Sequence, residues 1–190
     1  MAARDKDSVH MIGRGDKDRK RLRLKEYDYS LPGAYFVTIC TEDRENLFGE
    51  IAGNEMRLNV VGQIADKCWY ELPNHFGNIQ LDQFVVMPNH VHGIIIILDD
   101  PVGATHASPL PGTHNGLGDI VGSFKSAITK RVNAINSTPG APFWQRGYYD
   151  HIIRDDRSLT RIREYILRNP LRWALDNENL EYIGSDELVV

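Results

Sequence analysis

The sequence contains few cysteines and no long hydrophobic run. Only two of its 190 residues are cysteine, Cys40 and Cys68, and neither fits a metal-binding spacing. They predict core thiols in a reducing compartment, and a disulfide between them stays open as the alternative. No apolar run approaches the roughly 20 residues of a membrane helix, and the N-terminus is charged from Arg4 onward without a signal-peptide core. We therefore expect a cytoplasmic protein with no membrane partner.

A net positive charge is also absent, which by itself argues against a nucleic-acid partner. The formal net charge is −4 at pH 7, but the charges are distributed unevenly along the chain. Residues 14–25 (RGDKDRKRLRLK) are strongly basic, whereas residues 176–187 contain acids and no lysine or arginine. This pattern predicts a basic, disordered arm over residues 1–25, a single domain over 26–175 and an acidic tail over 176–190.

The most informative stretch of the chain is residues 84–98, which read FVVMPNHVHGIIIIL. His90 and His92 stand one residue apart at the start of a β-type apolar run. Side chains alternate across a strand, so residues i and i+2 share a face at a separation of about 7 Å. Two imidazoles in this arrangement can bind one metal ion, although a chance His-x-His is the alternative. The turn residues Met87-Pro88-Asn89 predict a tight hairpin between strands 81–87 and 90–98.

The remaining apolar patterns predict the order of the other elements. A central strand buried on both sides follows Gly33. From Leu58 the apolar residues recur at helical spacing, which predicts a helix that ends at Pro73. A long exposed loop covers residues 99–116, and then come a helix over 117–135, a strand over 148–154 and a helix over 159–169, with Ser158 as its cap and Pro170 as its end. The predicted fold is α+β: a ferredoxin-like sandwich with a mainly antiparallel sheet, helices on one face, and a C-terminal helix that carries Tyr165.

The last predicted helix holds a second set of candidate residues. Tyr165 and Asn169 are four residues apart, so they lie on one helix face, beside an apolar stripe of Leu159, Ile162 and Ile166. If this stripe packs on the sheet near the two histidines, Tyr165 and Asn169 face the metal. A tyrosine hydroxyl, with a pKa of about 10, needs a phosphate polarised by a cation in order to attack it. Asn169 could supply a neutral oxygen ligand, suited to Mg²⁺ or Mn²⁺, or could simply end the helix.

Three motifs carry a resemblance to a known family. MPNHVH at 87–92 resembles the HUH signature of the single-tyrosine transposases, and WQRGYYDHIIR and REYILRNP further on resemble the REP-associated tyrosine transposase branch. The resemblance spans residues 27–173 and implies the same ferredoxin-like fold. It also implies that His90 and His92 bind the metal, that Tyr165 takes the 5′ end of a cut single strand and leaves a free 3′-OH, and that Asn169 is the third ligand, where the transposon-borne enzymes have glutamine.

The resemblance also implies the substrate and cofactors. The family acts on single-stranded DNA folded as an imperfect hairpin, with repetitive extragenic palindromes among the candidates, and uses Mg²⁺ or Mn²⁺ and no nucleotide cofactor. We therefore expect metal-dependent nicking and strand transfer through a 5′-phosphotyrosine, in a nucleoid-associated monomer or homodimer. Two alternatives remain open: a protein that binds hairpin DNA without cutting it, and a metal-dependent phosphodiesterase that would not need Tyr165.

Several polar residues are candidates for DNA contacts. Basic side chains suit phosphates: phosphate contacts are favoured for the arginines around Tyr165, whereas lysines such as Lys125 and Lys130 usually just solvate a helix. Those predicted here are Lys125, Lys130, Arg154, Arg161, Arg168 and Arg172. His151 could support the tyrosine, or it could be a strand histidine satisfied within the fold. Trp144 and Tyr148 could stack on bases, with core packing as the default.

Overall fold

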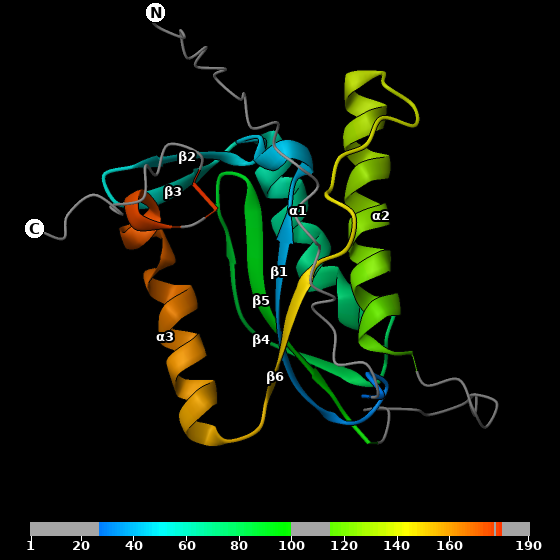
Figure 1. The fold of residues 1–190 in the computed structure, drawn as a ribbon. Helices are drawn as coiled ribbons and strands as arrows, with labels where there is room; N and C mark the ends of the chain where they lie inside the picture. Colours follow the sequence, from blue (N-terminus) through cyan, green and yellow to red (C-terminus); the bar gives the residue numbers. More distant parts are fainter. Residues whose placement is uncertain (1–26, 100–114, 177, 180–190) are drawn as a thin grey trace, which may run out of the picture.

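A four-stranded antiparallel sheet forms the centre of the protein. The computed structural model describes residues 27–99, 115–176, 178 and 179. The strand order is β4-β5-β1-β6, so that β1 and β5 are central and β4 and β6 lie at the edges (Figure 1). The bounds are Gly33–Cys40 for β1, Ile79–Val86 for β4, His90–Ile97 for β5 and Tyr149–Ile153 for β6. The basic arm expected at 1–25, nearly all of the 99–116 loop and most of the acidic tail lie outside the described residues.

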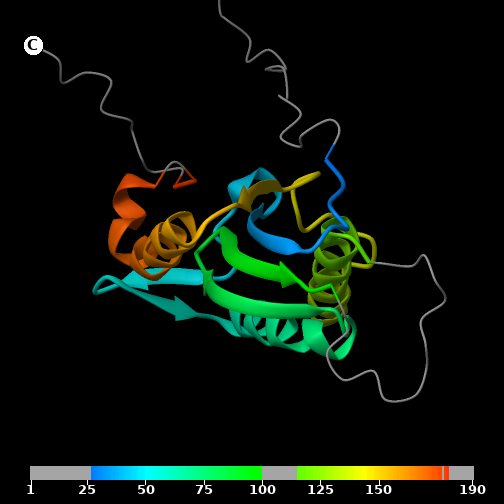
Figure 2. The same cartoon turned by 90° about the horizontal axis from the view of Figure 1, so that it is seen from below.

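The two faces of the sheet are covered by different helices. Helices α1 (Val60–Glu71) and α2 (Leu117–Asn136) pack on one face, and α3 (Asp156–Arg172) packs on the other, as the view along the sheet shows (Figure 2). A small hairpin of β2 (Gly49–Ala52) and β3 (Glu55–Leu58) follows β1. The element order and the antiparallel sheet confirm the predicted α+β sandwich. The predicted hairpin is also confirmed, because β4 and β5 pair in antiparallel register and Met87 N donates to His90 O at 2.8 Å.

The larger core lies between the sheet and helices α1 and α2. Alternation sends Val91 and Ile95 of β5 into this core, while the histidines face the other way. The indole of Trp69 lies directly on the backbone of Gly93 and stacks on Phe84 with ring centroids 4.3 Å apart. A β-carbon built on Gly93 would come within 2.3 Å of the Trp69 ring. The strand therefore needs a glycine immediately after the His-x-His pair.

A smaller core attaches α3 to the opposite face. Ile166 is fully buried against Phe36, Ile94 and Ile153, and the other two members of the predicted stripe pack around them. A bidentate ion pair adds to this attachment, because the Arg163 guanidinium donates to both carboxylate oxygens of Asp82, at the irregularity in β4. Its hydrogen bonds lower the pKa of the Asp82 carboxyl. The apolar stripe therefore packs where the sequence predicted.

The predicted ends of α3 are wrong. Its N-cap is Asp155, whose carboxylate accepts from the backbone N–H of Ser158 at 2.7 Å, so Ser158 lies within the first turn. The helix continues through Pro170 to Arg172. Proline removes one hydrogen-bond donor and clashes with the preceding turn, which ends most helices. This helix nevertheless continues for two more residues, and a 3₁₀ turn, Trp173–Leu175, then leads the chain back over the sheet.

Both cysteine thiols are free, so the disulfide alternative is excluded in this structure. Cys68 is a buried core thiol, as expected, whereas Cys40 is half-buried on the α3 face and donates to a Glu178 carboxylate oxygen at 3.3 Å. Among the described residues, no helix combines the length and the hydropathy that a bilayer crossing requires.

The close approach of Trp69 to Gly93 gives a test of the core. We expect Gly93→Ala to lower the free energy of unfolding by about 1–3 kcal/mol, because the new methyl group overpacks the indole. Gly122→Ala is the matched control: it lies in α2, where an added β-carbon meets nothing within 4 Å. Alanine favours a helix, so this change should raise stability by up to about 1 kcal/mol. Thermal melts measure both, and melting shifts of the same sign would contradict this account of the core.

Candidate functional site

His90 and His92 lie side by side on the face of β5 that α3 covers. Their Nε2 atoms are 2.9 Å apart, and their exposed fractions are 0% and 2%. They pair in register with Cys40 and Thr38 of the central strand β1. Because both strands are central, the two imidazoles are held on the most rigid part of the sheet.

The Nδ1 atom of each imidazole has a defined partner. His90 Nδ1 lies 2.8 Å from Asn89 Oδ1, and the amide nitrogen of Asn89 donates to the carbonyls of Arg44 and Glu178. Asn89 Oδ1 is therefore an acceptor, which places the proton on His90 Nδ1 and leaves a lone pair on its Nε2. His92 Nδ1 lies 2.8 Å from Thr38 Oγ1. When it donates there, both Nε2 lone pairs converge on one point, which is how two imidazoles bind a single cation.

Burial keeps both imidazoles neutral. Loss of solvation lowers the pKa of His90 to about 3, and it lowers the pKa of His92 well below its usual value, with His90 adding to that effect. The charged forms are therefore not populated at neutral pH. A neutral imidazole is the form that binds metals, so protons do not compete for these two nitrogens.

Tyr165 reaches the same point from α3. Its hydroxyl lies 3.2 Å from His92 Nε2, and its ring meets Phe36 edge-on at a centroid distance of 6.0 Å. The side chain keeps 39% exposure, so a substrate can reach it. Burial raises the pKa of Tyr165 to about 12, and the nearby Asp176 carboxylate adds to this effect. The hydroxyl is therefore protonated at neutral pH.

Asn169 lies one turn beyond Tyr165 and is almost completely buried. Its Nδ2 donates to Asp176 Oδ2 at 3.2 Å, while its Oδ1 is buried without a hydrogen-bond partner among the described residues. Because α3 continues past Asn169, the prediction that this residue ends the helix is wrong. An unpaired buried carbonyl oxygen costs free energy unless something binds it.

Asp176 completes this set, and the sequence analysis did not select it. One carboxylate oxygen of Asp176 and one nitrogen from each of His90 and His92 lie within 4.8 Å of one another, a spacing that could hold a metal ion. In the sequence, Asp176 stands at the start of the predicted acidic tail. The 3₁₀ turn after α3 brings it back over the histidines, and the only signal in the sequence was an acid shortly after Asn169.

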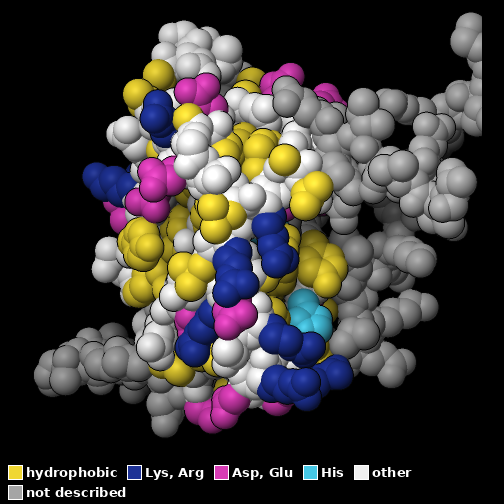
Figure 3. All heavy atoms as spheres, turned by 90° about the vertical axis from the view of Figure 1, so that its left-hand side faces the viewer, with side chains coloured by type: hydrophobic (Ala, Val, Ile, Leu, Met, Phe, Trp, Pro, Cys, Tyr) yellow, Lys and Arg dark blue, Asp and Glu magenta, His cyan; other side chains and the backbone are white. Residues whose placement is uncertain are grey.

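A pocket of about 740 Å³, which we call the histidine pocket, opens at this set, and His92, but not the fully buried His90, lines it. Its other polar lining residues are Thr38, Tyr149, Tyr165, Asn169, Arg172, Asp176 and Glu178. One of the predicted DNA-binding arginines, Arg172, therefore lies at the site. Arg154, Arg161 and Arg168 are exposed. Lysine and arginine side chains gather over the side of the molecule where α3 lies (Figure 3).

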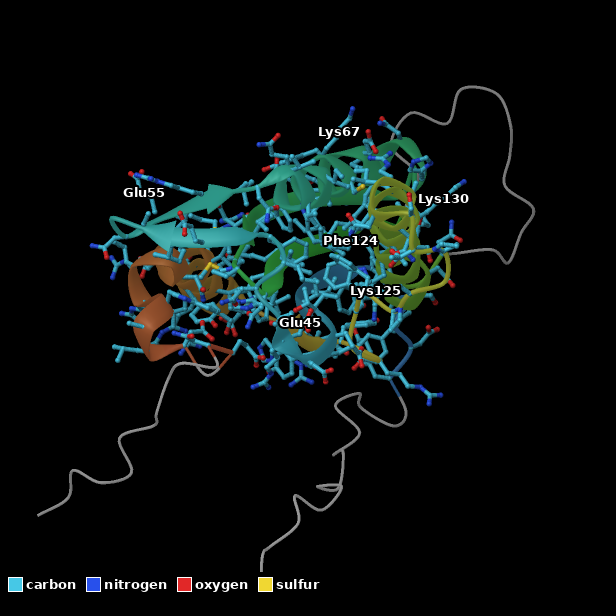
Figure 4. The ribbon with its side chains drawn as sticks, turned by 90° about the horizontal axis from the view of Figure 1, so that it is seen from above. Glu45, Glu55, Lys67, Phe124, Lys125 and Lys130 are labelled. Atoms are coloured by element: carbon cyan, nitrogen blue, oxygen red, sulfur yellow. The ribbon has the colours of Figure 1, made fainter. Side chains whose placement is uncertain are left out.

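The other predicted residues lie outside the histidine pocket. Lys125 and Lys130 belong to α2 (Figure 4), on the opposite side of the molecule from α3. Lys125 Nζ donates to the carbonyls of Gln145 and Gly147, and burial lowers the pKa of its ammonium group. His151 is exposed in a neighbouring depression. Trp144 is buried in the larger core, so the core-packing role expected for it is confirmed.

Comparisons with known proteins identify relatives of this chain. No protein-family model matches it. An uncharacterized protein of Haemophilus influenzae is 41% identical over 170 residues, which cover 85% of this chain and 93% of that protein. A second Haemophilus influenzae protein, provisionally named a REP-associated tyrosine transposase, is 22% identical over 153 residues, or 76% of this chain and 74% of that protein.

A solved structure adds a likeness in fold. The structure of a REP-associated tyrosine transposase bound to a REP hairpin has a TM-score of 0.56 at 17% identity, covering 81% of this chain and 76% of that chain. The resemblance that the HUH and Tyr-x-x-x-Asn-Pro motifs indicated is thus confirmed. The chain belongs to one family with the Haemophilus influenzae protein of 41% identity, and it is related to the REP-associated tyrosine transposases by its motifs and its fold.

Proposed function

We propose that this protein is a metal-dependent enzyme that nicks and rejoins single-stranded hairpin DNA through Tyr165. The observation that carries the proposal is the convergence of the Tyr165 hydroxyl and the two histidine Nε2 atoms, at 3.2 and 2.9 Å, on one solvent-accessible pocket. The fold-related transposase is described in complex with a REP hairpin, which supports hairpin DNA as the class of substrate.

The donor atoms around the histidines fit a divalent cation. His90 and His92 direct Nε2 atoms to one point, Asp176 adds a carboxylate oxygen, and the buried Asn169 Oδ1 has no other partner among the described residues. Mixed imidazole and oxygen donors of this kind suit Mn²⁺, and the oxygens suit Mg²⁺. When bound, the cation would offset charge on the non-bridging oxygens of a phosphate.

The residues of the chain would then carry out a transesterification. The Tyr165 oxygen forms a bond to phosphorus while the bond from phosphorus to the 3′ oxygen breaks; the phenol loses one proton, and the departing 3′ oxygen gains one to become the 3′-OH. Phe36 holds the tyrosine ring edge-on, and Arg172 supplies positive charge at the same pocket. One ester replaces another, so the strand can be rejoined without ATP.

Covalent attachment is the first test of this proposal. Incubation with Mn²⁺ or Mg²⁺ and a single-stranded hairpin should give a protein–DNA adduct that survives denaturation. Tyr165→Phe should abolish the adduct and leave hairpin affinity within about twofold, because only one hydroxyl group is lost. Tyr70→Phe, an exposed tyrosine on α1, is the matched control and should keep the full adduct yield.

Other results of this experiment would favour the alternatives. Hydrolysis of small phosphodiesters by Tyr165→Phe at the wild-type rate would indicate a metal-dependent phosphodiesterase. Tight hairpin binding by the wild-type protein without any adduct would indicate a binding protein that does not cut.

The proposed metal ligands can be tested independently of cleavage. Mn²⁺ should raise the melting temperature of the wild-type protein, because it binds the folded state alone. Asn169→Ala and Asp176→Asn should each weaken Mn²⁺ binding by roughly 10–100-fold, as changes to the residues around a bound metal typically do. Excess Mn²⁺ should then partly restore cleavage. Asp66→Asn removes a carboxylate on α1, across the sheet, and should leave the Mn²⁺ titration unchanged. Titration curves that superimpose on the wild type would remove the mutated residue from the metal site.

The exposed arginines predict a salt-dependent preference for structured single strands. A single-stranded hairpin should bind more tightly than a blunt duplex of the same sequence, and its affinity should fall steeply with salt. Arg168→Gln should reduce the slope of log affinity against log salt by about 1, because one phosphate contact is lost. Lys67→Gln removes the same charge from α1, on the opposite side of the sheet, and should leave the slope as it is. Equal affinity for hairpin and duplex would contradict this interpretation.

A further inference from the structure

The histidine pocket continues into a second depression between β6 and α3. This depression, which we call the outer groove, has a volume of about 330 Å³ and is lined by Phe36, Tyr149, His151, Ser158, Arg161 and Ile162. Phe36 and Tyr149 line both spaces, so they mark the junction between them. Apart from Phe36, the residues of the outer groove take no part in the proposed chemistry, yet they lie immediately beside it.

Tyr149 stands at this junction with its ring available to a ligand. It pairs with Thr38 across β1 and β6, so alternation places it on the face that carries His92 and Tyr165. Its exposed fraction is 42%, and its hydroxyl has no hydrogen-bond partner among the described residues. The ring meets Phe36 edge-on at a centroid distance of 6.3 Å, and Tyr165 also meets Phe36 edge-on, at 6.0 Å. Phe36 therefore contacts two accessible tyrosines.

The far end of the outer groove is suited to a phosphate. Arg161 is exposed and donates to Ser158 Oγ at 3.3 Å, and the His151 ring is exposed beside it. Asp155 also faces Arg161, but its carboxylate accepts from Ser158 N and Ser158 Oγ as the cap of α3, and the adjacent Asp156 is a second exposed acid in this turn. Arg154 and Arg157, exposed on either side of the β6–α3 turn, add further positive charge.

We infer that the outer groove is the subsite for the nucleotide next to the cleaved phosphate: its base stacks on Tyr149, and its other phosphate binds Arg161, with His151 and Ser158 as further donors. The inference rests on the proposed function and extends it, because it gives the path of the strand away from Tyr165. An aromatic ring followed by a cation is the arrangement with which proteins hold single-stranded DNA irrespective of sequence. Neither tyrosine needs to react for this subsite to exist.

The test uses a single-stranded hairpin with a single-stranded extension; where the wild-type protein cleaves it, the cleavage position identifies the flanking nucleotide, and otherwise each position of the extension is tested in turn. Tyr149→Ala should raise KM roughly 5- to 100-fold with kcat within about twofold, because the lost stacking acts on bound substrate and transition state alike. Tyr149→Phe keeps the ring and should restore wild-type KM. Tyr70→Ala, an exposed tyrosine on α1, is the matched control for a general loss of surface aromatics.

Modified substrates locate the contacts along the strand. An abasic site at the flanking nucleotide should weaken wild-type binding, measured by fluorescence anisotropy, and should leave Tyr149→Ala no weaker than it already is. A methylphosphonate at the next phosphate should do the same for Arg161→Gln. Abasic sites elsewhere in the extension should weaken wild type and Tyr149→Ala equally.

The outcomes separate this inference from the proposed function. If the wild-type protein cleaves but Tyr149→Ala responds to every abasic site as the wild type does, the subsite is wrong and the nuclease function stands. If the wild-type protein binds without cleaving, the proposed function fails, and position-specific interference that depends on Tyr149 still supports the groove. A wild-type protein that binds neither the hairpin nor its extension would overturn both.

Discussion

The packing of α3 on the sheet determines whether the site exists at all. Ile166 is fully buried against Phe36, Ile94 and Ile153, and Tyr165 precedes it in the chain, so the position of the phenol follows from this small core. A slip of one helical turn, about 5.4 Å, would take the hydroxyl out of reach of His92. The bidentate contact from Arg163 to Asp82 opposes such a slip, because it fixes the same helix to the edge strand β4.

The histidines depend on a different constraint: their ring nitrogens are buried away from water and need hydrogen-bond partners within the protein. Burying an imidazole costs free energy unless its N–H has a partner. The Nδ1 atom of His92 is hydrogen-bonded to Thr38 of β1, and that of His90 to Asn89 of the hairpin turn. The amide nitrogen of Asn89 in turn donates to the carbonyls of Arg44 and Glu178. Segments far apart in the sequence therefore cooperate to direct both Nε2 atoms into the pocket.

Most of the fold could be predicted from the sequence, because alternation and helical spacing are local signals. The hairpin before His90, the central strand after Gly33 and the apolar stripe of α3 are all visible as patterns. The geometry of Tyr165 beside His92 followed from these patterns, while the roles of both residues stay predictions. The end of α3 was missed because proline usually stops a helix, and this helix accommodates Pro170 two residues before it ends.

Asp176, Asn89 and Tyr149 could not have been selected in the same way. Their positions at the site depend on irregular chain paths or on the pairing of β6 with β1, and neither leaves a periodic signal in the sequence. Asp176 is also the least expected residue beside a phosphate, because its charge opposes both a phenolate and a phosphodiester. Among the described residues it has no salt bridge, and it raises the pKa of Tyr165. A divalent cation bound as proposed above would offset this carboxylate charge and would make the pocket more favourable for a phosphodiester.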